Sequence, residues 1–566
     1  MADRMNQQLL HPFSSGHGDD FAELPSPQIL IIGLGESGYA MAKWCLSQGA
    51  QVHLADTRAR AALNPQQQHW LNELQSLGLT RFTPEAMDWK SLLKGMNILG
   101  ISPGLSPLQE PAKSFLAICE EQKIPVWSEI EFFARALASL NRIAVEAGMK
   151  YQPSILAITG TNGKTTTSAL TAQICERAGR HVALAGNISP AALEKLSTVL
   201  NQAKSVSELP QIWVLELSSF QLHFTHTLNP TAATVLNLSQ DHLDWHGDMK
   251  SYAAAKARIL GSDSVLVLNR DDPLVSEIFS EAQDHKIISF GSDGPTESES
   301  FGIERDLNGG GIDWLVWAEP DEATQALEQE ESQEGFIKRR RRKKNNAYEE
   351  SDTLRIKRLI PADALRIRGR HNALNALAAL ALARAAGLGI GLLLHGLREY
   401  QGEPHRVQTV AVVQDVEYID DSKGTNVGAT VAALMGLGAA SGQKNIWLIA
   451  GGDGKGQDFT PLSEPIERFV KGLILIGRDG PVIEAVCSRP ISQGILRVIK
   501  AKDLESAVQL AAKHATAGDL VLLSPACASF DMFKNYQHRA DVFVEAVHEL
   551  ANQWNDNPTE HLGASA

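Results

Sequence analysis

The stretch LAITGTNGKTTT (residues 156–167) joins an apolar strand signal to a glycine-rich turn and the start of a helix. It ends like the phosphate-binding pattern G-x-x-x-x-G-K-[ST] but does not begin like it. Ile158 occupies the position of the usual first glycine, and the extra glycine, Gly160, stands two residues later. The strand–turn–helix frame matters more than this spacing, because it directs backbone N–H groups and a helix N-terminus at an anion. We therefore predict a phosphate site, with Lys164 supplying positive charge and the Thr165 hydroxyl reaching Mg²⁺.

The bulk properties indicate a large globular protein with an acidic balance. The chain has 566 residues, more than one hydrophobic core supports, so we expect roughly three or four domains. A hydrophobic fraction of 43% and a charged fraction of 21% are ordinary values. The net charge of −14 argues against a nucleic-acid partner. The five cysteines are scattered and lack CxxC spacing, which favours reduced thiols in a cytoplasmic protein over disulfides or a zinc site.

We expect no membrane partner and a monomeric chain. Residues 1–27 have neither the apolar core nor the cleavage site of a signal peptide, and they predict a flexible tail. The richest apolar region, residues 373–397, is interrupted by Asn375, Arg384 and glycines, so it does not fit a membrane span. It predicts a buried Ala/Leu helix ending near Gly387, followed by a second short helix.

Three blocks of alternating strand and helix signals predict an α/β protein of three domains with mostly parallel sheets. We expect a Rossmann-like substrate-binding domain over 28–127, a central P-loop-type ATPase domain over 128–403, and a Rossmann-like domain over 404–566. Within the central block, residues from about 292 to 352 change character. Seven consecutive bases at 338–344 nearly cancel seven nearby acids, which predicts a solvated insertion loop rather than a nucleic-acid patch.

A second glycine motif, Gly33-Leu-Gly-Glu-Ser-Gly, follows the apolar strand at 29–32 and opens a helix. Asp56 ends the next strand, about 20 residues on, where the dinucleotide fingerprint places an acid for a ribose hydroxyl. Taken alone, the motif suggests NAD. A different nucleotide and a turn without any ligand are both compatible with the same residues.

Three polar residues follow the phosphate loop in the central block. Glu216 lies inside the apolar strand WVLEL, where a carboxylate is costly unless it binds a metal or pairs with a lysine. Both readings stay open. His242 follows the strand AATVLNL in a polar loop, the place where doubly wound sheets bind ligands. Lys256, in SYAAAKARIL, is interpreted from its neighbours as a solvent-facing lysine.

Eight motifs in order resemble one family: TGTNGKTTT, LELSSFQL, NLSQDHLDWHG, YAAAKARI, GRHNALNALAAL, PHR, DDSKGTN and GGDGK. They are similar to the ATP-dependent Mur ligases of peptidoglycan synthesis. The first glycine-rich block and SPACASFDMFKNYQHR look like the branch that adds D-glutamate to UDP-N-acetylmuramoyl-L-alanine. The resemblance covers nearly the whole chain, except for the tail, the segment near 292–352 and the last dozen residues.

The resemblance implies a two-stage reaction that serves cell-wall biogenesis, and through it cell shape and division. ATP phosphorylates the terminal carboxylate of the UDP-sugar–L-alanine substrate to an acyl phosphate, giving ADP. The amine of D-glutamate then attacks and expels phosphate. Phosphorylation supplies a good leaving group, and catalysis is mainly positioning and charge stabilisation.

The resemblance also assigns residues to sites, and makes two Mg²⁺ ions and a carbamylated lysine expected. The catalytic set is Lys164, His242, Lys256 and His405. ATP would contact Gly160, Thr161, Asn162, Gly163, Lys164, Thr165, Thr166, Asn375, Arg406 and Asp421. The UDP-substrate would contact Glu36, Ser37, Asp56, Thr57, Arg58, Ser102, Gly104 and Asn187, in place of NAD. D-glutamate would contact Lys423, Thr425, Lys455, Ser529, Phe530 and Tyr536. The metal ligands would be Thr165, Glu216, His242 and Lys256 as its carbamate.

Three alternatives remain at this stage. Another Mur ligase would share the ATP chemistry and differ in the amino-acid pocket. A folylpolyglutamate-type ligase would not need the first block. An NAD-dependent oxidoreductase, or a nucleotide-regulated binding protein, explains the motif at 33–38 but leaves Lys164, Glu216 and Lys455 without a role.

Overall fold

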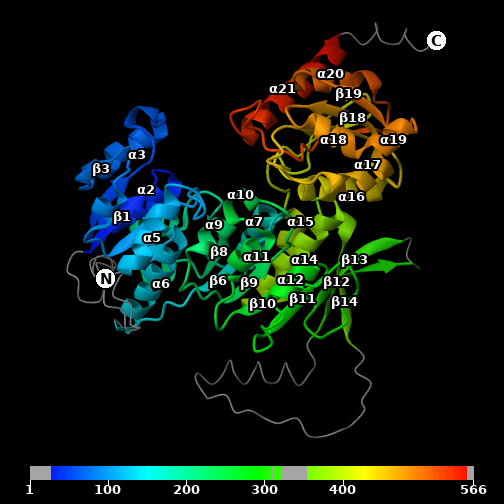
Figure 1. Ribbon diagram of the computed structural model, residues 1–566. Coiled ribbons are helices and arrows are strands. Elements are labelled where there is room, and N and C mark those ends of the chain that lie inside the picture. The colour runs from blue at the N-terminus through cyan, green and yellow to red at the C-terminus, as the bar shows by residue number, and fades with distance from the viewer. Residues whose placement is uncertain (1–26, 147, 308–310, 320–353, 557–566) are drawn as a thin grey trace.

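The computed structural model describes residues 27–146, 148–307, 311–319 and 354–556. Within them the chain forms three α/β bodies in chain order, each built on its own sheet (Figure 1). Parallel pairing dominates all three sheets, so the predicted fold class is confirmed. The predicted flexible tail and the basic run at 338–344 lie outside the described residues.

The first body is a five-stranded parallel sheet in the order β3-β2-β1-β4-β5. Its strands are β1 (Gln28–Ile32), β2 (Gln51–Ala55), β3 (Arg81–Thr83), β4 (Ile98–Ile101) and β5 (Val126–Trp127). Its helices are α2 (Glu36–Ser47), α3 (Pro65–Ser76), α4 (Trp89–Leu93) and α5 (Ala112–Gln122), with a 3₁₀ turn η1 at Arg60–Ala62, and α6 (Glu129–Glu146) packs against this body and the second one. Helix α6 also packs toward the second body, where the Phe133 ring lies 4.9 Å from that of Trp213.

The second body is a nine-stranded sheet in the order β14-β13-β12-β11-β10-β9-β6-β8-β7. Its strands are β6 (Ser154–Thr159), β7 (Val182–Gly186), β8 (Ile212–Glu216), β9 (Ala232–Val235), β10 (Val265–Asn269), β11 (Ile287–Phe290), β12 (Phe301–Asp306), β13 (Ile312–Ala318) and β14 (Ile356–Pro361). Its helices are α7 (Lys164–Arg177), α8 (Ala192–Gln202), α9 (Ser219–His223), α10 (Leu243–His246), α11 (Met249–Ala257), α12 (Pro273–Ile278), α14 (Arg370–Ala385) and α15 (Ile390–Glu399), with η2 (Val206–Glu208) and η3 (Ala362–Ala364).

The predicted Ala/Leu helix is α14, and the short helix after it is α15. Most side chains of α14 are buried alanine and leucine, so the helix lies close to α7 and the sheet. Residues 376–383 of this helix are alanine and leucine on every face and are fully buried, as expected for a core helix. Within the described residues no helix is long and apolar enough to span a membrane.

The interpretation of residues 292–352 as a solvated insertion loop is wrong for part of that range. Strands β12 and β13 pair antiparallel there and extend the central sheet. Phe301 is fully buried, and its ring stacks on Trp317 at 6.2 Å. Charged residues close to these two strands in the sequence made the whole segment look like a loop, although both strands carry buried aromatic residues. Residues 320–353 lie outside the described part of the chain.

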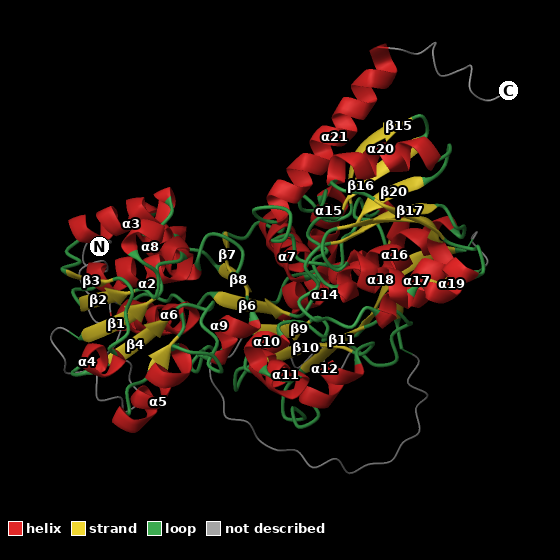
Figure 2. Cartoon of the chain, turned by 45° about the horizontal axis from the view of Figure 1, so that its top comes forward, coloured by secondary structure: helices red, strands yellow, loops and turns green. Residues whose placement is uncertain are grey.

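The third body is a six-stranded sheet in the order β15-β16-β20-β17-β18-β19, parallel except for the β15–β16 hairpin. Its strands are β15 (Gln408–Val413), β16 (Val416–Asp420), β17 (Ile446–Gly451), β18 (Val470–Ile476), β19 (Arg497–Lys500) and β20 (Leu520–Leu523). Its helices are α16 (Val427–Ser441), α17 (Ser463–Phe469), α18 (Gly480–Val486), α19 (Ser488–Ser492), α20 (Leu504–His514) and α21 (Tyr536–Asp556), with η4 at Thr460–Leu462. Figure 2 shows α21 running along this body and away from the other two.

Candidate active site

The centre of the candidate site is the carboxyl edge of the central sheet. Strand β6 lies between β8 and β9, and its last residues pair with the last residues of both neighbours. The loops after β6, β8 and β9 therefore meet at one edge, as expected where a doubly wound sheet binds its ligand. This topology brings the phosphate loop, Glu216 and His242 together.

The phosphate loop has the backbone shape that its glycines allow. Gly163 has φ +82° and precedes helix α7, which begins at Lys164. A Cβ on Gly163 would lie 2.5 Å from Oδ1 of Asn375, so the carboxamide is packed directly on the turn. The Lys164 ammonium donates to the carbonyls of Gly160 and Thr161 at 2.9 and 2.8 Å. Burial lowers its pKa, although nearby acids oppose the shift.

Glu216 ends β8 with its side chain buried, 2% exposed. Its Oε1 accepts a hydrogen bond from Asn187 Nδ2 at 2.8 Å. Its Oε2 is buried without a hydrogen-bond partner in the described part of the chain. The hydrogen bond to Glu216 comes from an amide, and Lys164 and Lys256 interact with it through charge alone, so a direct glutamate–lysine pair is not favoured. A buried carboxylate oxygen without a partner fits the metal alternative.

Lys256 is buried, 1% exposed, and the interpretation of a solvent-facing lysine is wrong. Its Nζ donates to Thr159 Oγ1 at 3.2 Å and to the Gly160 carbonyl at 2.9 Å. Burial, reinforced by Lys164, holds its pKa well below the ordinary value. One signal was available in the sequence. Tyr252 lies four residues earlier on the same helical face and is also buried, so that face of α11 points inward.

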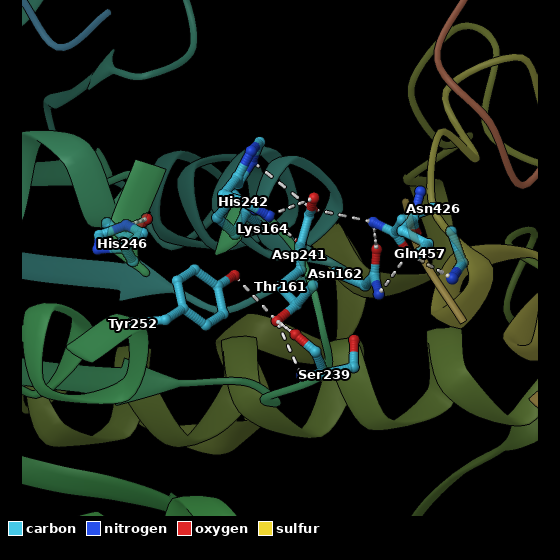
Figure 3. A network of polar contacts seen from close by, with 12 residues as sticks. Thr161, Asn162, Lys164, Ser239, Asp241, His242, His246, Tyr252, Asn426 and Gln457 are labelled. Carbon is cyan, nitrogen blue, oxygen red and sulfur yellow. Dashed lines mark hydrogen bonds and ion pairs between the residues drawn. The ribbon is translucent and has the colours of Figure 1, made fainter. Parts of the chain in front are cut away.

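His242 lies at the N-cap of α10 with a left-handed backbone, φ +54°. Its Nε2 is 3.5 Å from Asp241 Oδ2, and its ring contacts Phe220 edge-on. Burial lowers the pKa of His242, and the positive charges of the site also lower it while Asp241 opposes them. A neutral imidazole is the form that can bind a metal ion. Figure 3 shows His242 and Asp241 beside Lys164.

The third body reaches into the phosphate loop at two points. Arg406 Nη2 donates to the Thr165 hydroxyl at 2.6 Å. Asn426 and Asn162 exchange two amide hydrogen bonds, of 3.3 and 3.1 Å (Figure 3). Asn426 is also the N-cap of α16, accepting from Ala429 N–H. Between the loop and this body lies a small cavity of about 70 Å³, lined among others by Asn375, Arg406 and Asp421.

The carboxyl edge of the third sheet carries most of the residues assigned to D-glutamate. Lys423 and Thr425 follow β16, Lys455 follows β17, and Ser529 and Phe530 follow β20, and these strands are neighbours. The Lys423 ammonium lies 3.8 Å from the centre of the Tyr536 ring. Burial lowers the pKa of Lys423 to about 8. Lys455 and Phe530 are exposed, the latter by 69%, and Ser529 is buried. Of the residues assigned to D-glutamate, Lys423 and Tyr536 are in direct contact.

His405 and Asp421, also at this edge, are each held by a hydrogen bond to a buried partner. His405 Nδ1 lies 2.7 Å from Asp420 Oδ2. Asp421 is buried, and its Oδ2 accepts from the Ser524 hydroxyl at 2.7 Å. Burial raises the pKa of Asp421 to about 7. Asp421 and Arg406 both line the small cavity between the phosphate loop and the third body.

The residues assigned to the UDP-substrate lie at the carboxyl edge of the first sheet. They follow β1, β2 and β4, which are neighbours, except for Asn187 in the central body. Asp56 is fully engaged: its carboxylate accepts from Leu34 N–H at 2.7 Å and from Arg58 Nε and Nη2 at 2.8 and 2.7 Å. This carboxylate holds the loop, which does not favour a direct contact of Asp56 with either NAD or the UDP-substrate. Ser189 Oγ donates to Glu36 at 2.7 Å and links the first body to the central one.

The glycines of the first loop are explained partly by packing. A Cβ on Gly38 would lie 1.8 Å from the Gly33 carbonyl, and one on Gly33 would meet the Ser102 side chain at 2.8 Å. A Cβ on Gly35, by contrast, would meet nothing within 4 Å. Gly35 is thus the one of the three with open space beside the N-terminus of α2, where an anion is favoured.

Sequence reasoning missed four residues that organise the site. Asn237 holds the loop by exchanging two hydrogen bonds with the backbone of Asn162. Asp241, Asp420 and Asn426 are adjacent in sequence to predicted site residues, in the motifs QDH and DDSKGTN. Their signal in the sequence was a position at the end of β16 or in the loops after β9 and β16, and this does not distinguish one polar residue from the next.

The fold and the site together define an ATP-dependent ligase of the Mur type, and the chain belongs to the Mur ligase family. Three family models match in order: "Mur ligase MurD-like, N-terminal domain" over 27–126, "Mur ligase middle domain" over 158–383, and "Mur ligase, glutamate ligase domain" over 405–527. The oxidoreductase alternative is therefore wrong.

Curated relatives identify the branch of the family to which the chain is similar. A UDP-N-acetylmuramoylalanine–D-glutamate ligase of Ralstonia nicotianae is 51% identical over 531 residues, which is 94% of this chain and 98% of that protein. A ligase of the same name from Cupriavidus pinatubonensis is 53% identical over 535 residues, with the same coverage of both chains.

Two solved structures share the fold at low identity. MurF from Acinetobacter baumannii has a TM-score of 0.54 at 14% identity, covering 95% of this chain and 98% of its own. The MurF ligase from Thermotoga maritima in complex with ADP has a TM-score of 0.51 at 16% identity, covering 94% and 96%.

Proposed function

We propose that this chain is an ATP-dependent amide ligase that joins D-glutamate to the terminal carboxylate of UDP-N-acetylmuramoyl-L-alanine in peptidoglycan precursor synthesis. Support comes from the three family matches in order and from relatives of that name at about half identity over 94% of the chain. The observation that carries the proposal is the meeting of Lys164, Glu216 and Lys256 at one sheet edge, facing the cationic residues of the third body.

The chemistry follows from what these residues can do. Lys164 and the N-terminus of α7 after Gly163 would hold the ATP phosphates, with Asn375, Arg406 and Asp421 toward the nucleoside. Lys423 would attract a carboxylate of D-glutamate, because an ammonium pairs with a carboxylate by a charge-assisted hydrogen bond. The first sheet's edge would hold the UDP part through the residues around Gly35 and Arg58.

The residues present fit Mg²⁺. The partnerless Oε2 of Glu216 is a buried oxygen donor, and neutral His242 lies on the neighbouring loop. In the described residues no three His, Cys, Asp or Glu side chains form a metal cluster, which agrees with an ion held mainly by substrate phosphates. Bound Mg²⁺ would neutralise charge on the transferring phosphoryl group. We propose Thr165 and Glu216 for one ion, and His242 with carbamylated Lys256 for the second.

We also propose a monomeric enzyme of the cytoplasm. All five cysteines are free and buried, which fits a reducing compartment. The groups named for both stages of the reaction lie within one copy of the chain.

The proposal is tested by phosphate release with Mg-ATP and UDP-N-acetylmuramoyl-L-alanine while the amino acid is exchanged. We expect release with D-glutamate and none above background with L-glutamate, L-lysine or diaminopimelate. Release that does not depend on D-glutamate would refute the proposed substrate.

A further inference from the structure

The pair His405–Asp420 joins the two strands of the β15–β16 hairpin at its open end. His405 lies just before β15, and Asp420 ends β16, the partner strand of that hairpin. The distance from His405 Nδ1 to Asp420 Oδ2 is 2.7 Å. Asp420 is 0% exposed, and its other oxygen accepts from Ser422 N–H at 2.9 Å. The imidazole is thus the second donor to a buried carboxylate.

The loop around His405 is held in a restricted shape. His405 has a left-handed backbone, φ +64°, which is uncommon for a residue other than glycine and clusters at functional sites. Its N–H donates to Gln408 Oε1 at 3.0 Å, and its carbonyl accepts from Lys423 N–H at 3.2 Å. These bonds fix the ring relative to both the hairpin and the loop that carries Lys423.

The Asp420 contact determines which ring nitrogen carries the proton. A carboxylate only accepts, so Nδ1 must be the donor and Nε2 of the neutral ring is the acceptor. Among the described residues Nε2 has no hydrogen-bond partner. The ring lies 6.4 Å from that of Tyr536, which is in contact with the Lys423 ammonium. Arg406, the next residue, reaches the phosphate loop, so His405 stands between the two halves of the site.

We propose that Asp420 is a positioning residue for amide-bond formation, because it holds His405 in the tautomer whose Nε2 takes a proton from the ammonium group of D-glutamate. This inference rests on the proposed function. The ammonium gives one proton to Nε2 and becomes a neutral amine. The amine lone pair forms the C–N bond with the acyl-phosphate carbon. The C–O bond to the phosphoryl group then breaks, its electron pair leaves with phosphate, and phosphate carries away the second N–H proton.

The variant Asp420→Asn reverses the tautomer without changing the shape of the side chain. Ser422 N–H still needs an acceptor, so the new carbonyl oxygen stays there and the NH₂ faces Nδ1. Nδ1 then becomes the acceptor, and Nε2 carries hydrogen and cannot take a proton. ¹⁵N NMR of histidine-labelled protein, with His405 assigned from the His405→Gln variant, should show protonated Nδ1 in the wild type and protonated Nε2 in Asp420→Asn. The same tautomer in both proteins would overturn the inference.

Two nucleophiles separate this role from acyl-phosphate formation. D-glutamate arrives as an ammonium ion, whereas hydroxylamine is neutral near pH 7 and needs no base to form a hydroxamate. We expect Asp420→Asn and His405→Gln to lower kcat with D-glutamate by about 10²–10⁴-fold, the range of general acid–base catalysis. Hydroxamate formation should stay within about two-fold of the wild type, as should both activities of the control Asp415→Asn on the exposed turn of the hairpin.

The outcomes distinguish the two levels of the proposal. An equal loss with both nucleophiles would mean that Asp420 only maintains the structure, and no loss with D-glutamate would mean that His405 is not the acceptor. Absence of hydroxamate with wild-type protein, ATP and UDP-N-acetylmuramoyl-L-alanine would instead refute the proposed function, and this inference with it.

Discussion

The burial of Lys256 suits the carbamylation proposed for it, and the residues beside it in the sequence give no indication of this reaction. An ammonium ion without water is costly, and Lys164 nearby adds repulsion, so the pKa of Lys256 lies well below its ordinary value and the neutral amine is easier to form than in an exposed lysine. A neutral amine can add CO₂. The resulting carbamate would be an anionic oxygen ligand next to Lys164 and a metal ion, and the charge balance of the site would improve.

The variant Lys256→Ala should lose about 100-fold or more of the D-glutamate-dependent phosphate release, because it removes a proposed metal-holding group. Added short carboxylates such as formate should restore part of the activity by occupying the space of the carbamate. Lys250→Ala, at an exposed position of the same helix, is the matched control and should keep normal turnover. Normal turnover of Lys256→Ala would contradict the carbamate.

Some site residues could be predicted from sequence and others could not, for a physical reason. Glycines and an acid next to an apolar strand stand out, so the turn at 160–163 and Glu216 were found from local pattern. Lys256, Asp420 and Asn426 depend on contacts with residues far away in the chain. A family resemblance supplied Lys256. Asp420 became visible from its contact with His405 inside the third body, and Asn426 from the placement of that body against the phosphate loop.

At the scale of single elements, the turn between β6 and α7 has the strictest requirements. Gly163 is constrained by its left-handed backbone and by Asn375 from α14. The parallel strands of the central sheet could be predicted from sequence, because strands that are buried on both faces are near-continuous apolar runs. Strands β12 and β13 were not predicted, because charged residues lie before β12 and after β13 in the sequence and β13 pairs antiparallel with both neighbours, next to the edge strand β14.

The variant Gly163→Ala should abolish nucleotide binding, because the new methyl group would displace Asn375 or the turn. Gly179→Ala is a matched control, since Gly179 has the same φ, +82°, but a Cβ there meets nothing within 4 Å. Both should lose about 1–2 kcal/mol of unfolding free energy from the backbone. Thermal unfolding with and without an ATP analogue measures both effects. Equal nucleotide stabilisation in the two variants would contradict the packing argument.

The free energy of unfolding should depend on pH through Glu129, which lies where α6 contacts α8. Burial, with Glu36 nearby, raises the pKa of Glu129 to about 7, and its Oε1 accepts from Leu193 N–H at 2.6 Å. Because the folded pKa exceeds the unfolded one, the stability linked to this group is present below about pH 4 and is lost as pH rises toward 7.

Glu129→Gln keeps the acceptor for Leu193 and removes the ionisation. It should match the wild type at pH 4 and exceed its unfolding free energy by on the order of 1–3 kcal/mol at pH 8. Denaturant unfolding at both pH values measures the difference. Parallel stability curves from pH 4 to 8 would show that Glu129 is not buried as an acid.

At the scale of the whole molecule, the third body is closed onto the central one. The Asn162–Asn426 and Arg406–Thr165 contacts hold the two together, and the cavity between them is about 70 Å³. Ligand pockets for molecules of nucleotide size are usually several hundred Å³. We therefore expect the bodies to separate when ATP enters, by a hinge motion of the kind that many enzymes use.

Solution scattering should detect this motion. We expect the profile to change when an ATP analogue is added. Asn426→Ser keeps an N-cap for α16 but cannot reach Asn162, so its radius of gyration without nucleotide should exceed that of the wild type. Superimposable profiles for both proteins, with and without nucleotide, would contradict the hinge.

The proposed reaction predicts where one oxygen atom goes. UDP-N-acetylmuramoyl-L-alanine with ¹⁸O in its terminal carboxylate is incubated with Mg-ATP, D-glutamate and the wild-type chain, and the released phosphate is analysed by mass spectrometry. If the carboxylate is activated as an acyl phosphate, each phosphate released carries one ¹⁸O atom, and an equal amount of amide product and ADP is formed. Phosphate without ¹⁸O would show that the carboxylate is never phosphorylated and would contradict the mechanism built on Lys164, Glu216 and Lys256.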